Sequence, residues 1–287
     1  MKTYVWVLCL PLAFAGCVLG ERVPIEMVST SQIQPINKEK ALDSAIRLDV
    51  GSLEITSGKQ SGSLYSYDLL YDKTSFTHDL QYNPAFGGTE GRLNLSLRNT
   101  RKTGIHPKRN DNKLHIAFNN SIPLSLNVSA GVGAARLSLS GLQISRIEVE
   151  SGVGEASITA FEPNAIQCDS VRLKSGVGRF EAVGLGNLHF RDLEFEGGVG
   201  SATLDFTGEW KQDADIRMHV GVGEVSVRIP REIGVKVESA KNFLSGLFLE
   251  GFTRQDSYHY SNNYDRASTR VTIHVTTGIG GFRITWV

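Results

Sequence analysis

The sequence predicts an all-β protein, a single-chain β-solenoid with coils of about 22 residues and a glycine corner in each coil. Gly-Val-Gly occurs five times between residues 131 and 223, and Gly-Ile-Gly follows at 278–280. Apolar residues alternate with polar ones on both sides of each tripeptide, which is the period of a half-buried strand. The predicted corner residues are Gly131, Gly133, Gly152, Gly154, Gly176, Gly178, Gly198, Gly200, Gly221, Gly223, Gly278 and Gly280.

The first 17 residues have the pattern of a secretory signal peptide. One lysine precedes an apolar stretch, Tyr4 to Ala15, that is shorter than the roughly 20 residues of a membrane-spanning helix. Two cleavage sites are open. Phe14-Ala15-Gly16-Cys17 resembles a lipobox, in which Cys17 becomes the acylated N-terminus, and Ala13-Phe14-Ala15 is a site for cleavage after Ala15. We therefore expect an exported protein of the periplasm or outer membrane, with a lipid anchor on Cys17.

Residues 18–43 are polar with weak periodicity, and we expect a flexible tether there. The solenoid is expected to span 44–287. Its first part, 44–125, contains strand-like runs and turn-rich segments, which we interpret as irregular N-terminal coils, with a degenerate corner at Val50.

The regular coils are expected over 126–287. Around each tripeptide, inward residues fall at even positions before the central valine and at odd positions after it, so the alternation slips by one residue. A bulge or corner must absorb such a slip, and glycine adopts the backbone angles that this requires. We expect the central valine, such as Val153, to point inward.

Outward residues alternate in charge from coil to coil. Three positions before the central valine, successive copies carry Ser129, Glu150, Lys174, Glu196 and His219. Opposite charges in neighbouring strands favour one register. The pattern therefore predicts that consecutive coils are neighbours in parallel register.

The spacing of 57 residues between the last two copies predicts an insertion, placed at 240–268, with room for two irregular coils. It contains an apolar run, KNFLSGLFLEGF, interpreted either as an end cap or as a surface for a partner. It also contains Tyr258, Tyr260 and Tyr264 in a polar stretch, a candidate interaction loop.

The runs SIPLSLNVSAGVGAARLSLSGLQISRIEVESGVGEASI, GGVGSATLDFTGEW and GVGEVSVRIPREIGVKVE resemble the toast-rack domain of bacterial envelope proteins. That family is similar to the C-terminal part of LiaF-like proteins and to adhesin-type β domains. The resemblance implies a β-solenoid in the cell envelope and no catalytic residues. The sequence lacks the N-terminal transmembrane helices of LiaF-like proteins, which weighs against a membrane-embedded stress sensor.

The residues themselves show no pattern of a catalytic, metal or cofactor site. The glycines are followed by strand patterns and not by a helix, so they do not form a phosphate-binding loop. Metal-ligand spacing is absent, and thirty basic residues balance thirty acidic ones, which does not favour nucleic acid. We expect a non-enzymatic envelope protein that binds a protein or a glycan, or acts as a scaffold. A carbohydrate-active β-helix enzyme and an accessory protein of envelope stress remain alternatives.

Overall fold

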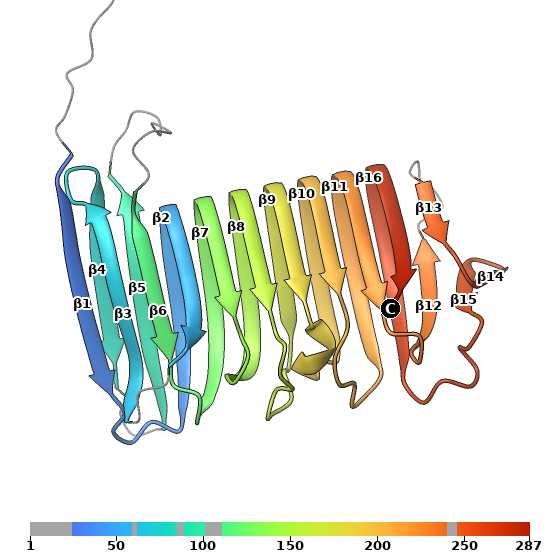
Figure 1. The fold of residues 1–287 in the computed structure, drawn as a ribbon, viewed down its shortest axis with the longest axis horizontal. Coiled ribbons are helices and arrows are strands. Elements are labelled where there is room, and N and C mark those ends of the chain that lie inside the picture. Colours follow the sequence, from blue (N-terminus) through green and yellow to red (C-terminus); the bar gives the residue numbers. More distant parts are fainter. Residues whose placement is uncertain (1–24, 59–61, 85–88, 101–110, 240–245) are drawn as a thin grey trace, which may run out of the picture.

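The computed structural model describes residues 25–58, 62–84, 89–100, 111–239 and 246–287. Within these ranges, sixteen strands form one continuous sheet, which is folded over along its length into a flat solenoid with two layers (Figure 1). The predicted all-β solenoid is therefore confirmed. A short 3-10 helix, η2 (Leu185–Leu188), lies in a connection between two strands.

Seven long strands build the body of the solenoid. Each one crosses both layers, because it bends at its glycine corner, and a loop at the opposite edge leads to the next strand (Figure 1). They are β2 (Ala41–Ser57), β7 (Pro123–Ser138), β8 (Gln143–Thr159), β9 (Val171–Val183), β10 (Asp192–Asp205), β11 (Ala214–Ile229) and β16 (Arg270–Trp286).

These seven strands lie side by side in that order, parallel and with glycine opposite glycine. Gly154 is the neighbour of Gly133 on one side and of Gly178 on the other. The degenerate copy follows the same register, since Val50 pairs with Val132. The parallel register predicted from the charge columns is correct from β7 to β11.

At the N-terminal end, two short strands lie parallel to β2, one in each layer, and the strands beyond them are antiparallel. In one layer, β2 is followed outward by β6 (Lys113–Phe118), β3 (Ser63–Asp72) and β1 (Met27–Pro35). In the other layer it is followed by β5 (Glu90–Asn99) and β4 (Phe76–Asn83). The region 44–125, expected to form irregular coils, thus combines strands parallel to β2 with antiparallel strands at the end of the sheet.

The 18–43 interval, expected to be a tether, contains ordered structure. All of β1 and the start of β2 lie within it. In β1, the half-buried residues Val28, Thr30 and Gln32 alternate with exposed ones, and the strand pairs with β3. Residues 18–24 lie outside the described part of the chain.

The C-terminal end also departs from the predicted order. The insertion does not stack between the last two copies, because β16 pairs directly with β11. The intervening chain lies beyond β16. There, β12 (Gly234–Ser239), β15 (Tyr258–Ser261) and β14 (Phe252–Gln255) extend one layer, and β13 (Gly246–Leu249) extends the other.

The core runs the length of the solenoid between the two layers. It is filled by the inward residues of every long strand, such as Ile147, Leu173, Phe195 and Ile216, each at most 1% exposed. At the loop edge two buried asparagines take the place of strand pairing. Asn164 binds the backbone of Ile144 through both side-chain atoms, and Asn187 bridges Ala160 and Glu209.

Candidate interaction surface

The edge formed by the glycine corners is the most regular surface of the molecule. The second glycine of each corner has a positive φ, for example +137° at Gly154 and +136° at Gly178, a conformation that residues with a Cβ rarely adopt. A Cβ there would also collide with the carbonyl oxygen of the matching glycine in the preceding coil. Glycine is therefore required for two reasons, backbone conformation and close approach.

The central residue of the corner points outward in five successive coils, which corrects the prediction for Val153. The backbone turns at the positive-φ glycine, and this change of direction carries the preceding side chain out of the alternating pattern. Five residues in register are between 45% and 67% exposed. We call this row the valine ridge: Val153, Val177, Val199, Val222 and Ile279.

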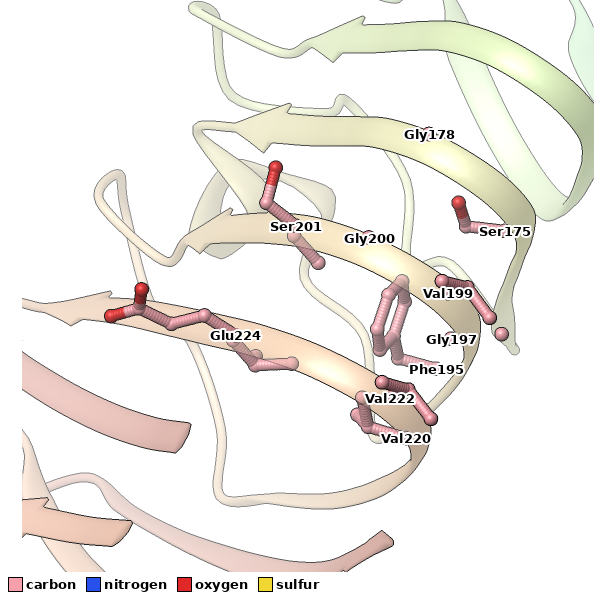
Figure 2. A pocket seen from close by; sticks show the side chains of 13 residues that line it. Ser175, Gly178, Phe195, Gly197, Val199, Gly200, Ser201, Val220, Val222 and Glu224 are labelled. Atoms are coloured by element: carbon pink, nitrogen blue, oxygen red, sulfur yellow. The ribbon is translucent and has the colours of Figure 1, made fainter. Parts of the chain in front are cut away.

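A small hollow beside the ridge is shown in Figure 2. It lies between Val199 and Val222, over the ring of Phe195 and the backbone of Gly197. The hollow has a volume of about 10 Å³, enough for roughly one water molecule. The edge therefore offers a row of apolar side chains and not a small-molecule pocket.

Charged residues of both signs flank the ridge. On one side, Lys174 lies 3.3 Å from Glu196, as the alternating charges predicted, and Arg172 lies 3.8 Å from Glu194. On the other side Arg283 lies 3.8 Å from Glu224. These pairs are exposed, so they specify the register of the coils more than they stabilise the fold.

The sequence matches the profile of the family described as the N-terminal domain of toast_rack, DUF2154, over residues 23–183 and 170–228. Together the two matches cover well over half of the chain. The chain belongs to this toast-rack family.

Solved structures with low sequence identity were also found. A "putative cell adhesion protein" from Clostridium sporogenes is 18% identical, with a TM-score of 0.48, over 91% of this chain and 100% of that one. A "putative adhesin" from Bacteroides fragilis is 11% identical, with a TM-score of 0.36, over 91% of this chain and 97% of that one. A search of curated proteins gave no match.

The histidines that the structure describes in this toast-rack chain do not gather into a metal site. His219 is exposed in its charge column, as expected. His274 also points outward but lies between two carboxylates, with Nδ1 2.8 Å from Glu238 and Nε2 3.0 Å from Asp215. Within the described ranges, no group of three or more histidine, cysteine or acidic residues is placed to hold a metal ion.

The three tyrosines of the predicted interaction loop lie together, but two of them belong to a strand. Tyr258 and Tyr260 are in β15, and Tyr264 follows in a turn, with its ring centroid 5.0 Å from that of Tyr260. Lys236 lies over the ring of Tyr258 and Arg270 near the ring of Tyr264. All three tyrosine side chains are half-buried, so the cluster is part of the end cap that β12, β14 and β15 form.

The apolar run of the insertion packs mainly onto the last coil. Leu247, Leu249 and Phe252 contact the core, and Phe252 stacks on Trp286 at 5.4 Å. Phe248 is half exposed, with the Arg283 guanidinium 4.4 Å from its ring centroid. These described residues agree with an end cap. Residues 240–245 lie outside the described part.

Cysteine chemistry is confined to one described residue. Cys168 is a free, fully buried thiol, and burial raises its pKa to about 12, so it is a structural residue. The candidate lipidation site, Cys17, lies outside the described residues. Over the described ranges, no helix has the length and apolar composition needed to cross a membrane.

Proposed function

We propose that this protein is a non-enzymatic protein of the bacterial cell envelope that binds another envelope protein along the valine ridge. The observation that carries this proposal is the exposure of the same apolar position in five successive coils. With strands about 4.8 Å apart, the five side chains form a row about 19 Å long. Exposed apolar groups arranged contiguously are typical of interaction sites.

The β2 corner supports a role for the ridge beyond folding. Val50 occupies the ridge position of that coil but is only 1% exposed. The chain itself covers this corner, since Asn112 donates to the Val50 carbonyl oxygen and the Asn99 amide donates to Asp49. In the next coil the equivalent Val132 is partly buried against the core. In the five coils after it the position is open, which is consistent with a cover supplied by a partner.

The flanking charges indicate the chemistry of that partner. Because Glu150, Lys174 and Glu196 alternate in sign, a surface of uniform charge, such as an anionic bilayer, would be attracted by some coils and repelled by others. A protein surface with its own alternating charges and an apolar groove fits better.

A ridge variant tests this proposal. Val177→Thr, Val199→Thr and Val222→Thr together keep β-branched side chains of nearly the same shape but replace the apolar row with hydroxyls. A matched control changes the outward column of the same coils, with Glu181→Gln, Thr203→Ser and Ser226→Thr. Partners would be cross-linked in intact envelopes, identified by quantitative mass spectrometry, and then purified for measurement of Kd.

We expect one partner to bind the wild type and the control equally and the ridge variant at least tenfold more weakly. Equal binding of every reproducible partner to the wild type and the ridge variant would refute the ridge as the binding surface.

Export and lipid anchoring through Cys17 remain part of the proposal, supported by the N-terminal pattern. Mass spectrometry of the mature N-terminus tests it. Acylated Cys17 is expected, whereas an unmodified chain beginning at Gly16 would replace the anchor with ordinary signal cleavage after Ala15.

A further inference from the structure

The N-terminal edge of the sheet ends in β1, a strand with one free side. Among the described residues, β1 pairs with β3 alone. A free edge is a row of unpaired backbone donors and acceptors, and proteins normally protect such edges with charges, short strands or bulges.

The other edges of the described sheet have such protection, and β1 has little. The edge strands β13 and β14 have four residues each. The edge strand β4 carries the exposed charge of Asp79 near its centre. By contrast β1 has nine residues, MVSTSQIQP, without any charge, and its only bulge and proline are at its end.

The outward face of β1 is also unusually apolar for an edge. Ile25, Met27 and Ile33 are among the most exposed large apolar residues of the structure, and Ile33 is 56% exposed. They lie on the same face because they are an even number of residues apart. The edge therefore combines unpaired backbone with exposed apolar side chains.

The free backbone groups of β1 can be assigned from one hydrogen bond. The Lys73 amide donates to the Glu26 carbonyl oxygen, at 3.0 Å, so residue 26 turns its backbone toward β3. Antiparallel pairing alternates along a strand, so the backbones of Val28, Thr30 and Gln32 also face β3. Those of Met27, Ser29, Ser31 and Ile33 face the free side.

Because the backbone groups of alternate residues face the free side, β1 can pair with β1 of a second copy of the protein. With a two-fold axis at Ser31, antiparallel strands place Ser31 opposite Ser31 of the second copy and Ser29 opposite its Ile33. Every such pair joins residues whose backbone groups both face the free side, and no charge opposes another. The same axis brings Met27 against Pro35 of the second copy, which covers exposed apolar surface.

We propose that two copies of this protein associate through their β1 strands, which extend the sheet across a two-fold axis at Ser31. The contact is isologous and closes after two copies, as two-fold contacts do. It lies at the end of the solenoid and does not depend on the valine ridge.

A charge-pair experiment tests both the strand and its register. The double variant Ser29→Lys, Ile33→Lys places lysine opposite lysine twice across the axis. The double variant Ser29→Lys, Ile33→Glu places lysine opposite glutamate instead, at the same two positions. A matched control, Thr77→Lys with Gln81→Lys, adds the same two charges four residues apart to the exposed face of the edge strand β4.

The molar mass of each purified full chain, kept in mild detergent, would be measured by light scattering after gel filtration over a range of concentrations. We expect dimers for the wild type, the control and the Lys/Glu variant. The Lys/Lys variant should dissociate at least about tenfold more readily, because like charges oppose directly. Circular dichroism confirms that each variant is folded.

Three results would overturn the proposal. They are a monomeric wild type throughout the range, a Lys/Lys variant that is as dimeric as the control, and an assembly that grows beyond two copies. Equal weakening by Lys/Lys and Lys/Glu would exclude the register with Ser31 at the axis.

Discussion

The carbonyl oxygen of Gly133 occupies the place that a Cβ on Gly154 would need. The same relationship links the second glycines of successive corners all the way to Gly280. Neighbouring coils can therefore stack in register only if each of these positions lacks a side chain. The glycine repeat is a steric requirement of the stacked corner.

Gly178→Ala is expected to destabilise the protein by more than about 4 kcal/mol, because the new Cβ is strained by the backbone and collides with the Gly154 carbonyl. The free energy of unfolding in urea measures the effect. Gly141→Ala is the control, since Gly141 also has a positive φ but its nearest neighbouring atoms are 3.5 Å or more away. It should cost about 1 kcal/mol. Equal costs at the two positions would show that close approach contributes nothing.

Asn164→Ala is expected to cost about 3 kcal/mol. The side chain is 3% exposed, and its loss leaves both the amide and the carbonyl of Ile144 buried without their partner. Asn120→Ala, at an exposed loop position, should change stability by less than about 0.5 kcal/mol. The comparison uses the same urea titration, and a small effect at Asn164 would mean that water replaces the amide.

Lys174→Glu is expected to cost up to about 1 kcal/mol, because the new carboxylate lies between Glu150 and Glu196 in the aligned strands. Adding Glu150→Lys and Glu196→Lys restores the alternation and should recover most of the loss. The recovery should shrink in 1 M salt, where the screening length is about 3 Å. Thermal unfolding of all variants measures this coupling, and additive effects would contradict it.

The lowered pKa of the Asp72 carboxyl leads us to expect that the protein loses stability in acid. Burial alone would raise the pKa of its carboxyl, but hydrogen bonds from Ser75, Thr74 and the Glu26 amide outweigh burial and lower the pKa from 3.8 to about 2. The carboxylate therefore stabilises the fold fully above pH 3.8, and this contribution disappears as the pH falls toward 2.

The shift corresponds to about 2 kcal/mol. Asp72→Asn should lower the free energy of unfolding at pH 7 and flatten its dependence on pH between 4 and 2. A variant that keeps the wild-type slope in this range would assign the acid sensitivity to other carboxyls.

The coils and their register could be predicted from the sequence. The alternation of apolar and polar residues and the order of charges from coil to coil are both visible in a single sequence. Charges such as those of Glu150, Lys174 and Glu196 are set by their neighbours in adjacent coils, so their alternation contains information on pairing. The orientation of Val153 could not be read in the same way. Alternation predicts the direction of a side chain only where the backbone keeps the negative φ of an ordinary strand. Gly154, directly after Val153, has a positive φ and interrupts the alternation.

The ends of the solenoid were beyond prediction for a different reason. Tyr258 and Tyr260 lie in a four-residue strand that is held by β12 and β14 and carries no clear alternation of its own. Likewise, β1 is polar enough to look like a tether, and only its pairing with β3 orders it. Short or polar strands are specified by their neighbours more than by their own residues.

The position of β16 between β11 and β12 affects how the protein can be completed during synthesis. The strands β12 to β15 leave the ribosome before the strand on which β12 and β13 dock. Until residues 270–286 are available, β11 ends the stack with its open side unprotected. A chain that stops before residue 270 should therefore expose both β11 and the residues of the cap to proteases and to other unfolded chains. Once β16 is present, it pairs with β11, β12 and β13 and covers the open side of β11 in one late step.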